Sequence, residues 1–470
     1  MDFKRKFSMS MYKNLSIKIG EMTFLKDFVN DKRGDLYPLA KKSDDCLESV
    51  ENNEYILKKG SAERLICQFF PFATFELSFA ELNGEVGFSL KLPETEAYFM
   101  VDGKQFFYSC EDHKECHALS ERCSESSSLV VSCRPGAFDI YCRCNDKPDY
   151  VCTVYEEKFK ESNQYETFTN GYAFLCGSGS VTVKKVVAYI DNGVSMADIR
   201  PMKYEDGSVL MEGGKLYFTA SIRIQEGSYQ GMFAWIPGTS EISMTGVLFY
   251  DCGDGKWRNY IAPVILFNRE KRLWYVWVSS FEHKHILAYA SFEGDPRFGV
   301  NVVDVQFMKE ATETSDFRDF VGFKGDEDPD LLYDKENDRW LLAICRIDPK
   351  TRGYVYLFFE SHVPFEGFRY IGQANPGEET GGSFVRIQGE LHFICGNGSK
   401  VTSEYRIYNK NGMRLAKFNY PDGGYRGWGC VFPVTLGSRT RYFFLTFDRH
   451  NGSAYNWSYG NVYGFEVSNF

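Results

Sequence analysis

The segment RWLLAICRI, residues 339–347, carries the pattern that decides the fold of the second part of the chain. It is a run of aromatic and aliphatic residues directly after the polar turn KEND, and such residues suit strands better than helices. Four further runs of this kind are KLYFTASI (215–222), RLWYVWVSS (272–280), ELHFICGN (390–397) and RYFFLTFDR (441–449). The anchors are 57, 67, 51 and 51 residues apart: Leu216, Leu273, Trp340, Leu391 and Tyr442. Repetition at this period indicates a repeat architecture.

Each copy of the repeat contains further short strands. One precedes the turn (RPMKY, APVILF, DPDLLY, GSFVRI, CVFPVTL), and a third strand follows the anchored run (GMFAWI, HILAYASF, YVYLFF, EYRIY, VYGFEV). Four copies carry a fourth strand: TGVLFYD, VVDVQFM, FRYIG and MRLAKF. Because blades of four strands build propellers, residues 195–470 are predicted to form a five-bladed β-propeller. The fifth copy ends at Phe470 after its third strand, so an earlier strand is expected to complete that sheet. A stacked array of separate sheets is the alternative.

Residues 14–193 read as short strands separated by turns. Phe75, Leu77 and Phe79 alternate with polar residues, as in a half-buried strand. Asn83-Gly84 predicts a hairpin turn, and residues 181–190 are rich in β-branched side chains. These features predict a β-sandwich ahead of the propeller, and therefore an all-β fold. The segment loosely resembles the concanavalin-like sandwiches attached to many carbohydrate-active proteins.

The overall charge narrows the range of partners. The chain has 470 residues, with Lys+Arg 54 and Asp+Glu 64, and a formal net charge of −10. Nucleic acids and anionic membranes need clustered positive charge, so neither is expected as a main partner. No stretch of 18 or more apolar residues could span a membrane, and no apolar run follows the basic N-terminus as in a secretory signal. We therefore expect a cytoplasmic protein, or an exported one if a leader has been removed.

Eight of the 14 cysteines lie between residues 110 and 176. The run from Cys110 through His113, Cys116 and His117 to Cys123 is one candidate zinc site, but it lacks two cleanly spaced ligand pairs. Buried reduced thiols that pack as small hydrophobic residues are the preferred interpretation. We therefore expect no metal ligands here, and disulfides only if the protein is exported.

Acidic residues mark the segments that lead into the innermost strands, where a propeller directs side chains toward its central channel. Asp328 lies twelve residues before Trp340, and Glu379 lies twelve before Leu391, which predicts one register for both acids. Aligning the prolines of the first three blades sets Arg200 and Ala262 opposite Asp328. Asp198 should share a face with Arg200, because strand side chains repeat every two residues. The sequence therefore predicts that three carboxylates meet at one end of the central channel, beside Arg200 and Arg346. These are the carboxylates of Asp198, Asp328 and Glu379.

Converging carboxylates suit the cleavage of glycosidic bonds. One stays ionised while the pKa of a neighbour rises, so that one protonates the leaving oxygen and another activates water or attacks carbon. Four residues near the same entries are expected to offer stacking faces or hydrogen bonds to a sugar: Trp257, Tyr260, Trp428 and His450. The acids Asp326, Glu327, Asp330 and Glu378 are interpreted as solvated. The histidines His113, His117, His283 and His285 are interpreted as surface loop residues.

With these acids at the start of innermost strands, residues 195–470 resemble the five-bladed propeller glycosidases of glycoside hydrolase families 43, 32 and relatives. The resemblance implies hydrolysis of an oligosaccharide, with a furanoside of arabinose or fructose type as the expected substrate. It also implies roles for three residues: Asp198 as base or nucleophile, Asp328 as the residue that tunes the acid, and Glu379 as general acid. Blade two departs from the pattern, because Ala262 stands where the tuning Asp is expected. No cofactor is expected, and a structural calcium ion in the channel is compatible with the resemblance.

Two other classes of function remain open at this point. A non-catalytic carbohydrate-binding protein would keep the channel without the chemistry, and the missing acid in blade two favours it. A propeller scaffold for protein partners would show an exposed apolar patch in place of an acidic pocket.

Overall fold

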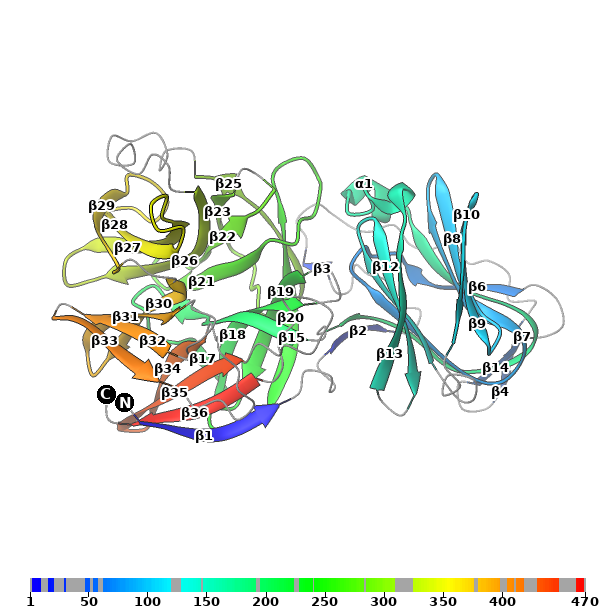
Figure 1. Ribbon diagram of the computed structural model, residues 1–470, viewed down its shortest axis with the longest axis horizontal. Coiled ribbons are helices and arrows are strands. Elements are labelled where there is room, and N and C mark those ends of the chain that lie inside the picture. The colour runs from blue at the N-terminus through cyan, green and yellow to red at the C-terminus, as the bar shows by residue number, and fades with distance from the viewer. Residues whose placement is uncertain are drawn as a thin grey trace. The chain divides into compact units, whose positions relative to one another are not determined.

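The computed structural model consists almost entirely of strands (Figure 1). The two helical elements in the described residues are the short segments η3 (Glu157–Phe159) and α1 (Tyr165–Phe168), each of which buries one phenylalanine. The predicted all-β fold is thus confirmed, and no described helix is long and apolar enough to cross a membrane. The structure describes residues 2–9, 16–20, 29–30, 47–50, 54–57, 62–119, 128–144, 147–191, 195–223, 228–239, 241–282, 285–308, 324–375, 379–397, 404–409, 411–417, 429–447 and 462–468.

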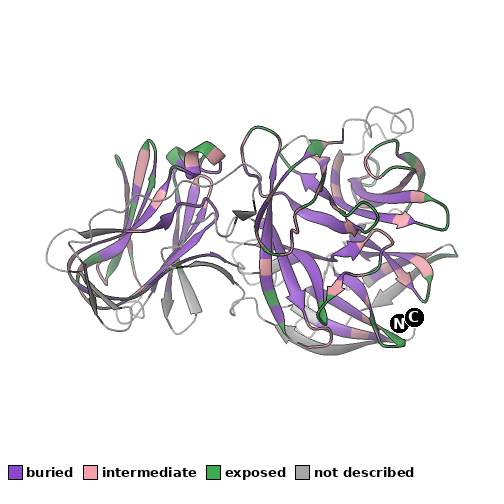
Figure 2. Ribbon diagram, turned by 180° about the vertical axis from the view of Figure 1, so that it is seen from behind, coloured by how far each residue is buried: buried purple, intermediate pink, exposed green. Residues whose placement is uncertain are grey.

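The chain divides into two compact units. One contains Ser16–Asp191 and the short segment Asp254–Arg258, and the other contains Met1–Leu15, Asn192–Gly253 and Asn259–Phe470. The division after Asp191 lies close to the boundary expected from the sequence. In both units most described strand residues are buried (Figure 2).

The first unit is a sandwich whose two sheets share their longest strands, β7 (Thr74–Leu92) and β14 (Tyr172–Asp191). One half of β7 pairs with β8 and the other half with β11, while β14 runs beside it throughout. The rings of Phe75 and Phe88 lie 5.8 Å apart, although a straight strand would separate these residues by roughly 40 Å. The long strands therefore bend across the core and enter both sheets. The other strands of this unit are β2 (Ser16–Gly20), β3 (Val29–Asn30), β4 (Leu47–Val50), β5 (Glu54–Leu57), β6 (Ala62–Gln68), β8 (Thr95–Val101), β9 (Gln105–Cys110), β10 (His113–Ala118), β11 (Ser128–Arg134), β12 (Ala137–Cys144) and β13 (Lys147–Tyr155).

The hairpin predicted at Asn83-Gly84 is wrong, because β7 continues through both residues. Gly84 pairs with Gly179 of β14 and has a φ of 149°. A Cβ atom at Gly84 would lie 1.9 Å from the carbonyl oxygen of Ser178. The glycine therefore permits a close approach of two bent strands, and not a two-residue turn.

The second unit is a five-bladed propeller, as predicted. Its innermost strands are β15 (Ser195–Pro201), β21 (Ile261–Asn268), β26 (Lys324–Asp334), β30 (Glu379–Ile387) and β34 (Cys430–Leu436). Each contacts the innermost strand of the next blade, and β34 contacts β15, so the five sheets close a ring. The second strands are β18 (Lys215–Arg223), β22 (Leu273–Ser280), β27 (Arg339–Ile347), β31 (Glu390–Asn397) and β35 (Arg439–Phe447). The third strands are β19 (Ser228–Trp235), β23 (Ile286–Phe292), β28 (Tyr354–Ser361), β32 (Glu404–Asn409) and β36 (Val462–Ser468).

The outer strands show how the ring is completed. Blade five takes its fourth strand from the start of the chain, since β1 (Asp2–Met9) pairs antiparallel with β36 (Figure 1). This confirms the expected contribution of an earlier strand. The segment predicted as the fourth strand of blade two divides between two sheets: β24 (Gly299–Asp304) lies parallel to β20 (Ile242–Asp251) of blade one, and β25 (Gln306–Phe307) pairs with β23. The remaining strands are β16 (Lys203–Tyr204), β17 (Met211–Glu212), β29 (Arg369–Gln373) and β33 (Gly412–Lys417).

Neighbouring blades are held together by separate apolar clusters. Trp277 and Leu342 belong to the cluster between blades two and three, and Tyr405 and Phe444 to the cluster between blades four and five. Trp235 of blade one packs against Phe443 of blade five, with ring centroids 5.6 Å apart. Burial of these large side chains stabilises the ring and fixes the strand entries that face the channel.

Candidate functional site

The innermost strands of blades one to four carry the same backbone bulge. In each blade the pairing with the second strand shifts register where a residue with positive φ lies, and blade three has one further shift, between Lys324 and Glu327. These residues are Asp198 (52°), Ala262 (58°), Asp328 (46°) and Gly381 (61°). Left-handed backbone is costly for a residue with a Cβ atom, but aspartate tolerates it better than most. The bulge thus gives two acids, Asp198 and Asp328, equivalent positions in the ring.

This equivalence corrects the sequence alignment of Glu379 with Asp328. Gly381, and not Glu379, occupies the bulge of blade four. Counting back from Trp340 and Leu391 failed because the hairpin before β27 contains four residues, 335–338, whereas the one before β31 contains two, 388–389. Glu379 begins β30 opposite Asn397, and its side chain lies outside the described residues.

The proline alignment of blade one was also wrong. Asp198 itself stands at the bulge position that corresponds to Asp328. Arg200 follows two residues later, as Asp330 follows Asp328, and both resume regular pairing with their second strands. Arg200 therefore lies two residues beyond the bulge of its strand, at the position that Asp330 occupies in blade three.

The carboxyl group of Asp328 is buried and hydrogen-bonded. Its side chain is 8% exposed, its main-chain N–H donates to Oγ of Ser279 over 3.1 Å, and its Oδ2 accepts from the N–H of Gly381 over 3.0 Å. Burial raises the pKa of Asp328 to about 7, the negative charge of Asp198 adds to the rise, and Arg200 opposes it. The two bulge acids therefore interact electrostatically, and Asp328 holds a proton over part of the neutral range.

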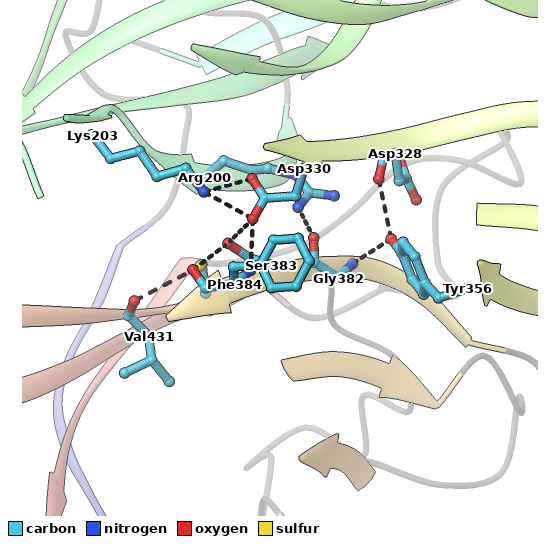
Figure 3. A network of polar contacts seen from close by, with 10 residues as sticks. Arg200, Lys203, Asp328, Asp330, Tyr356, Gly382, Ser383, Phe384 and Val431 are labelled. Atoms are coloured by element: carbon cyan, nitrogen blue, oxygen red, sulfur yellow. Dashed lines mark hydrogen bonds and ion pairs between the residues drawn. The ribbon is translucent and has the colours of Figure 1, made fainter. Parts of the chain in front are cut away.

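Arg200 crosses from blade one to blade four, where Nη1 donates to the carbonyl oxygen of Gly382 (Figure 3). Its side chain is 2% exposed, and Nε and Nη2 have no hydrogen-bond partner among the described residues. Burial lowers the pKa of Arg200. Its neighbours Tyr356, Asp328 and Asp330 raise the pKa by a larger amount, so the net shift is upward. Arg200 thus brings a permanent positive charge to the inner side of the acids.

Asp330 is the centre of a buried network that the sequence interpretation missed (Figure 3). It forms an ion pair with Lys203, whose Nζ lies 2.7 Å from Oδ1, and both side chains are 1% exposed. Its Oδ2 accepts from the N–H of Phe384 over 2.6 Å and from Oγ of Ser383 over 3.1 Å. The interpretation of Asp330 as a solvated residue is therefore wrong. No local signal marked it, because the bulge at Asp328 breaks the alternation of strand faces between the two residues.

The acids next to Asp328 are also paired. Asp326 is 5% exposed and accepts a 2.5 Å bond from Nε of Arg346, so it is not solvated. Arg346 thus reaches this group of acids through Asp326. His285 lies 3.1 Å from Glu327 (Nε2 to Oε1); burial lowers the pKa of His285, but Glu327 raises it more, and the net shift is upward. Glu327 and His285 are partly exposed, at 20% and 30%.

Two aromatic residues expected to contact sugar are core residues instead. Trp257 belongs to the sandwich unit, is 0% exposed and packs against Phe168 with ring centroids 4.8 Å apart. Tyr260 is 3% exposed and stacks on Tyr250 in the propeller core. A fully packed ring offers no open face for stacking on a sugar, which corrects the expectation for Trp257 and Tyr260. Trp428 and His450 lie outside the described residues.

The candidate zinc ligands of the sandwich form other contacts. His113 and His117 both contact Glu115 on β10, and Nδ1 of His113 lies 2.9 Å from the carboxylate of Glu156. Within the described ranges no group of three His, Cys, Asp or Glu side chains is arranged to hold a metal ion. Most described cysteines are buried, none of them is in a disulfide, and Cys116 is the exposed one.

The sequence matches no family model and no curated protein. The solved structures that share part of the backbone arrangement include the following three. An exo-β-1,3-galactanase from Clostridium thermocellum is 11% identical, with a TM-score of 0.41 over 58% of this chain and 63% of its own length. The catalytic domain of a family 62 α-L-arabinofuranosidase from Coprinopsis cinerea is 12% identical, with a TM-score of 0.37 over 57% and 92%. A family 117 glycoside hydrolase from Zobellia galactanivorans is 12% identical, with a TM-score of 0.39 over 58% and 84%. The chain therefore spans less than two thirds of the galactanase structure.

Proposed function

We propose that the propeller is a glycoside hydrolase whose reaction takes place beside Asp198 and Asp328. The observation that carries the proposal is the placement of two acids at equivalent bulges, with the pKa of Asp328 raised to about 7 by burial and by the charge of Asp198. Glycosidic cleavage needs one protonated and one ionised carboxyl group in the same site. Asp328, with its raised pKa, supplies the protonated member of such a pair beside the charge of Asp198.

The roles follow from these environments. Asp198 is the base or nucleophile, and Asp328 is the group that holds a proton to donate to the leaving oxygen near neutral pH. Glu379 is a second candidate for the general acid, supported by the family resemblance and by its position two residues before the bulge of blade four. In that case Asp328 tunes Glu379, and removal of each residue has a different effect on poor leaving groups.

The substrate we propose is a neutral oligosaccharide with a terminal furanoside, of arabinose or fructose type. The family resemblance supports the furanoside. The charges support a neutral sugar, because Arg200 and Lys203 are balanced by the acids around them and leave no excess positive charge to attract an anion.

A screen of aryl furanosides and plant oligosaccharides tests the proposal, with three variants run beside the wild type. If Asp328 is the acid, Asp328→Asn should lower the hydrolysis of natural oligosaccharides about 100-fold or more and should affect activated aryl substrates much less. The same asymmetry in Glu379→Gln, and not in Asp328→Asn, would assign the acid to Glu379. Glu336→Gln, in the exposed hairpin of blade three, is the matched control and should leave the rates unchanged.

A non-catalytic carbohydrate-binding protein is the second candidate. Ala262 favours it, because blade two places a methyl group where blades one and three place carboxyls. Binding of an oligosaccharide with no hydrolysis by the wild type across the screen would support this candidate and would contradict the glycosidase.

A further inference from the structure

Tyr356 of β28 links the Asp328 bulge to blade four. Its side chain is 0% exposed, and its hydroxyl accepts a 2.5 Å bond from the N–H of Gly382. The same hydroxyl donates to the main-chain oxygen of Asp328 over 3.3 Å (Figure 3). One side chain therefore bridges the acid of blade three and the backbone that follows the bulge of blade four.

Asp328 is held at a second point by the same stretch of blade four. Gly381, the residue before Gly382, donates its N–H to Oδ2. The other carboxyl oxygen, Oδ1, accepts no hydrogen bond from the described residues. Since an oxygen that accepts an N–H bond is a poor place for a proton, the protonated form of Asp328 carries its proton on Oδ1. The position of the Gly381–Gly382 backbone thus decides which oxygen holds the proton and where it points.

An equivalent tyrosine occurs in blade four, whose bulge residue is Gly381 and not an acid. Tyr405 of β32 pairs with Gly396 as Tyr356 pairs with Cys345, which makes the two tyrosines equivalent. The Tyr405 hydroxyl accepts from the N–H of Gly429 over 2.9 Å and contacts Thr446 of blade five. Both tyrosines therefore join neighbouring blades; Tyr356 bonds the bulge acid of its own blade, Asp328, whereas the bulge of the blade that carries Tyr405 is Gly381.

We propose that Tyr356 is a positioning residue for Asp328: it holds the Gly381–Gly382 backbone against the acid and so directs the Asp328 carboxyl into the channel mouth. This inference rests on the proposed glycosidase function. Tyr356 stays a hydrogen-bond donor throughout, because burial and then the charge of Asp328 raise the pKa of its hydroxyl. It does not itself exchange a proton with substrate.

The test compares Tyr356→Phe with Tyr405→Phe. Each variant removes one hydroxyl and leaves one glycine N–H unpaired, so each should lower the melting temperature by a similar amount. Tyr356→Phe alone should lower kcat about 10- to 100-fold with KM changed less than about twofold, because the acid is displaced and not the sugar. It should also raise the pKa of Asp328 by roughly one unit, because the Gly381 bond that favours the ionised form is weakened.

The pKa is read without any substrate, from the carboxyl carbon of Asp328 in a protein labelled at aspartate and assigned with Asp328→Asn. If Tyr356→Phe and Tyr405→Phe leave this titration and the rates equally unchanged, Tyr356 is only a blade contact and the proposal is wrong. If the wild type hydrolyses nothing but the titration still moves in Tyr356→Phe alone, the proposed function fails while the positioning role stands.

Discussion

The main-chain N–H of Gly381 in blade four donates a hydrogen bond to the carboxylate of Asp328 in blade three. In blades one and two a serine hydroxyl accepts the equivalent hydrogen bond from the bulge of the next blade. Ser221 accepts from the N–H of Ala262, and Ser279 accepts from the N–H of Asp328. The equivalent residue of blade three is Cys345, as the pairing of each second strand with its bulge shows. The bulge of blade four is therefore held by the acid itself, and the geometry of the acid depends on that backbone.

Replacing Cys345 with serine should let a residue other than Asp328 hold the bulge of blade four. A hydroxyl at this position competes with Asp328 for the N–H of Gly381, as its counterparts do in blades one and two. Because that N–H stabilises the ionised carboxyl, the pKa of Asp328 should rise by roughly one unit. Titration of the labelled carboxyl measures the change. A fall in the pKa would show that the serine leaves the Gly381 bond intact and acts in some other way.

The raised pKa of Asp328 predicts a definite dependence of stability on pH. A carboxyl whose pKa is higher in the folded than in the unfolded state stabilises the fold at low pH, and this contribution is lost as pH rises from about 4 to about 7. The difference amounts to about 4 kcal/mol of unfolding free energy as an order of magnitude. Asp328→Asn should remove this decline. Denaturant unfolding at pH 4, 5.5 and 7 measures it, and parallel curves for wild type and variant would contradict the shift.

Asp198→Asn should lower the pKa of Asp328, because the second cause of its elevation is the negative charge of Asp198. The amide keeps the size of the side chain, so the bulge should persist. The pH at which wild-type stability declines should then move down in this variant. Asp304→Asn, which changes the exposed acid at the end of strand β24, is the control and should leave that pH unchanged.

The buried pair of Lys203 and Asp330 should be costly to break from one side. Lys203→Met leaves an uncompensated carboxylate at 1% exposure and should lower the unfolding free energy by about 3–5 kcal/mol. Adding Asp330→Asn removes that charge, keeps an oxygen for the N–H of Phe384, and should recover part of the loss. Lys271→Met, which breaks an exposed pair with Glu270, should not change the denaturation midpoint. Equal losses in Lys203→Met and in the double variant would show that the lysine acts through packing alone.

The cysteines should titrate as free thiols. Most of those described are buried and none is in a disulfide, and burial raises the pKa of Cys67 and Cys152 to about 12, which makes them unreactive in the folded state. We expect slow reaction with a thiol reagent in native protein, apart from Cys116, and full reaction in denaturant without a reductant. Stable disulfides in protein taken from its native cell would contradict the expected reducing compartment.

The sequence predicted the blades well because their anchor runs are strongly aromatic and periodic. Trp277, Trp340 and Phe393 lie in strands that are buried along most of their length, and a continuous apolar run of strand length is visible in the sequence itself. The register of the acids on the innermost strands was harder to predict from the sequence. A two-residue difference in hairpin length moved Glu379 away from the bulge, and proline spacing misaligned Arg200. The positive φ angles of Asp198 and Asp328 could not be inferred from the amino-acid composition of these segments. The ion pair of Lys203 with Asp330 joins residues 127 positions apart and depends on ring closure.

The pairing of β1 with β36 has a consequence for how the protein is made. More than 450 residues separate Asp2–Met9 from Val462–Ser468. A ribosome that adds about 5–20 residues per second needs roughly 20–90 s to deliver the partner of the first strand. The sandwich and the first four blades are made during that interval, before the partner of β1 is available. Closure of blade five therefore joins two segments of the nascent chain that are made far apart in time.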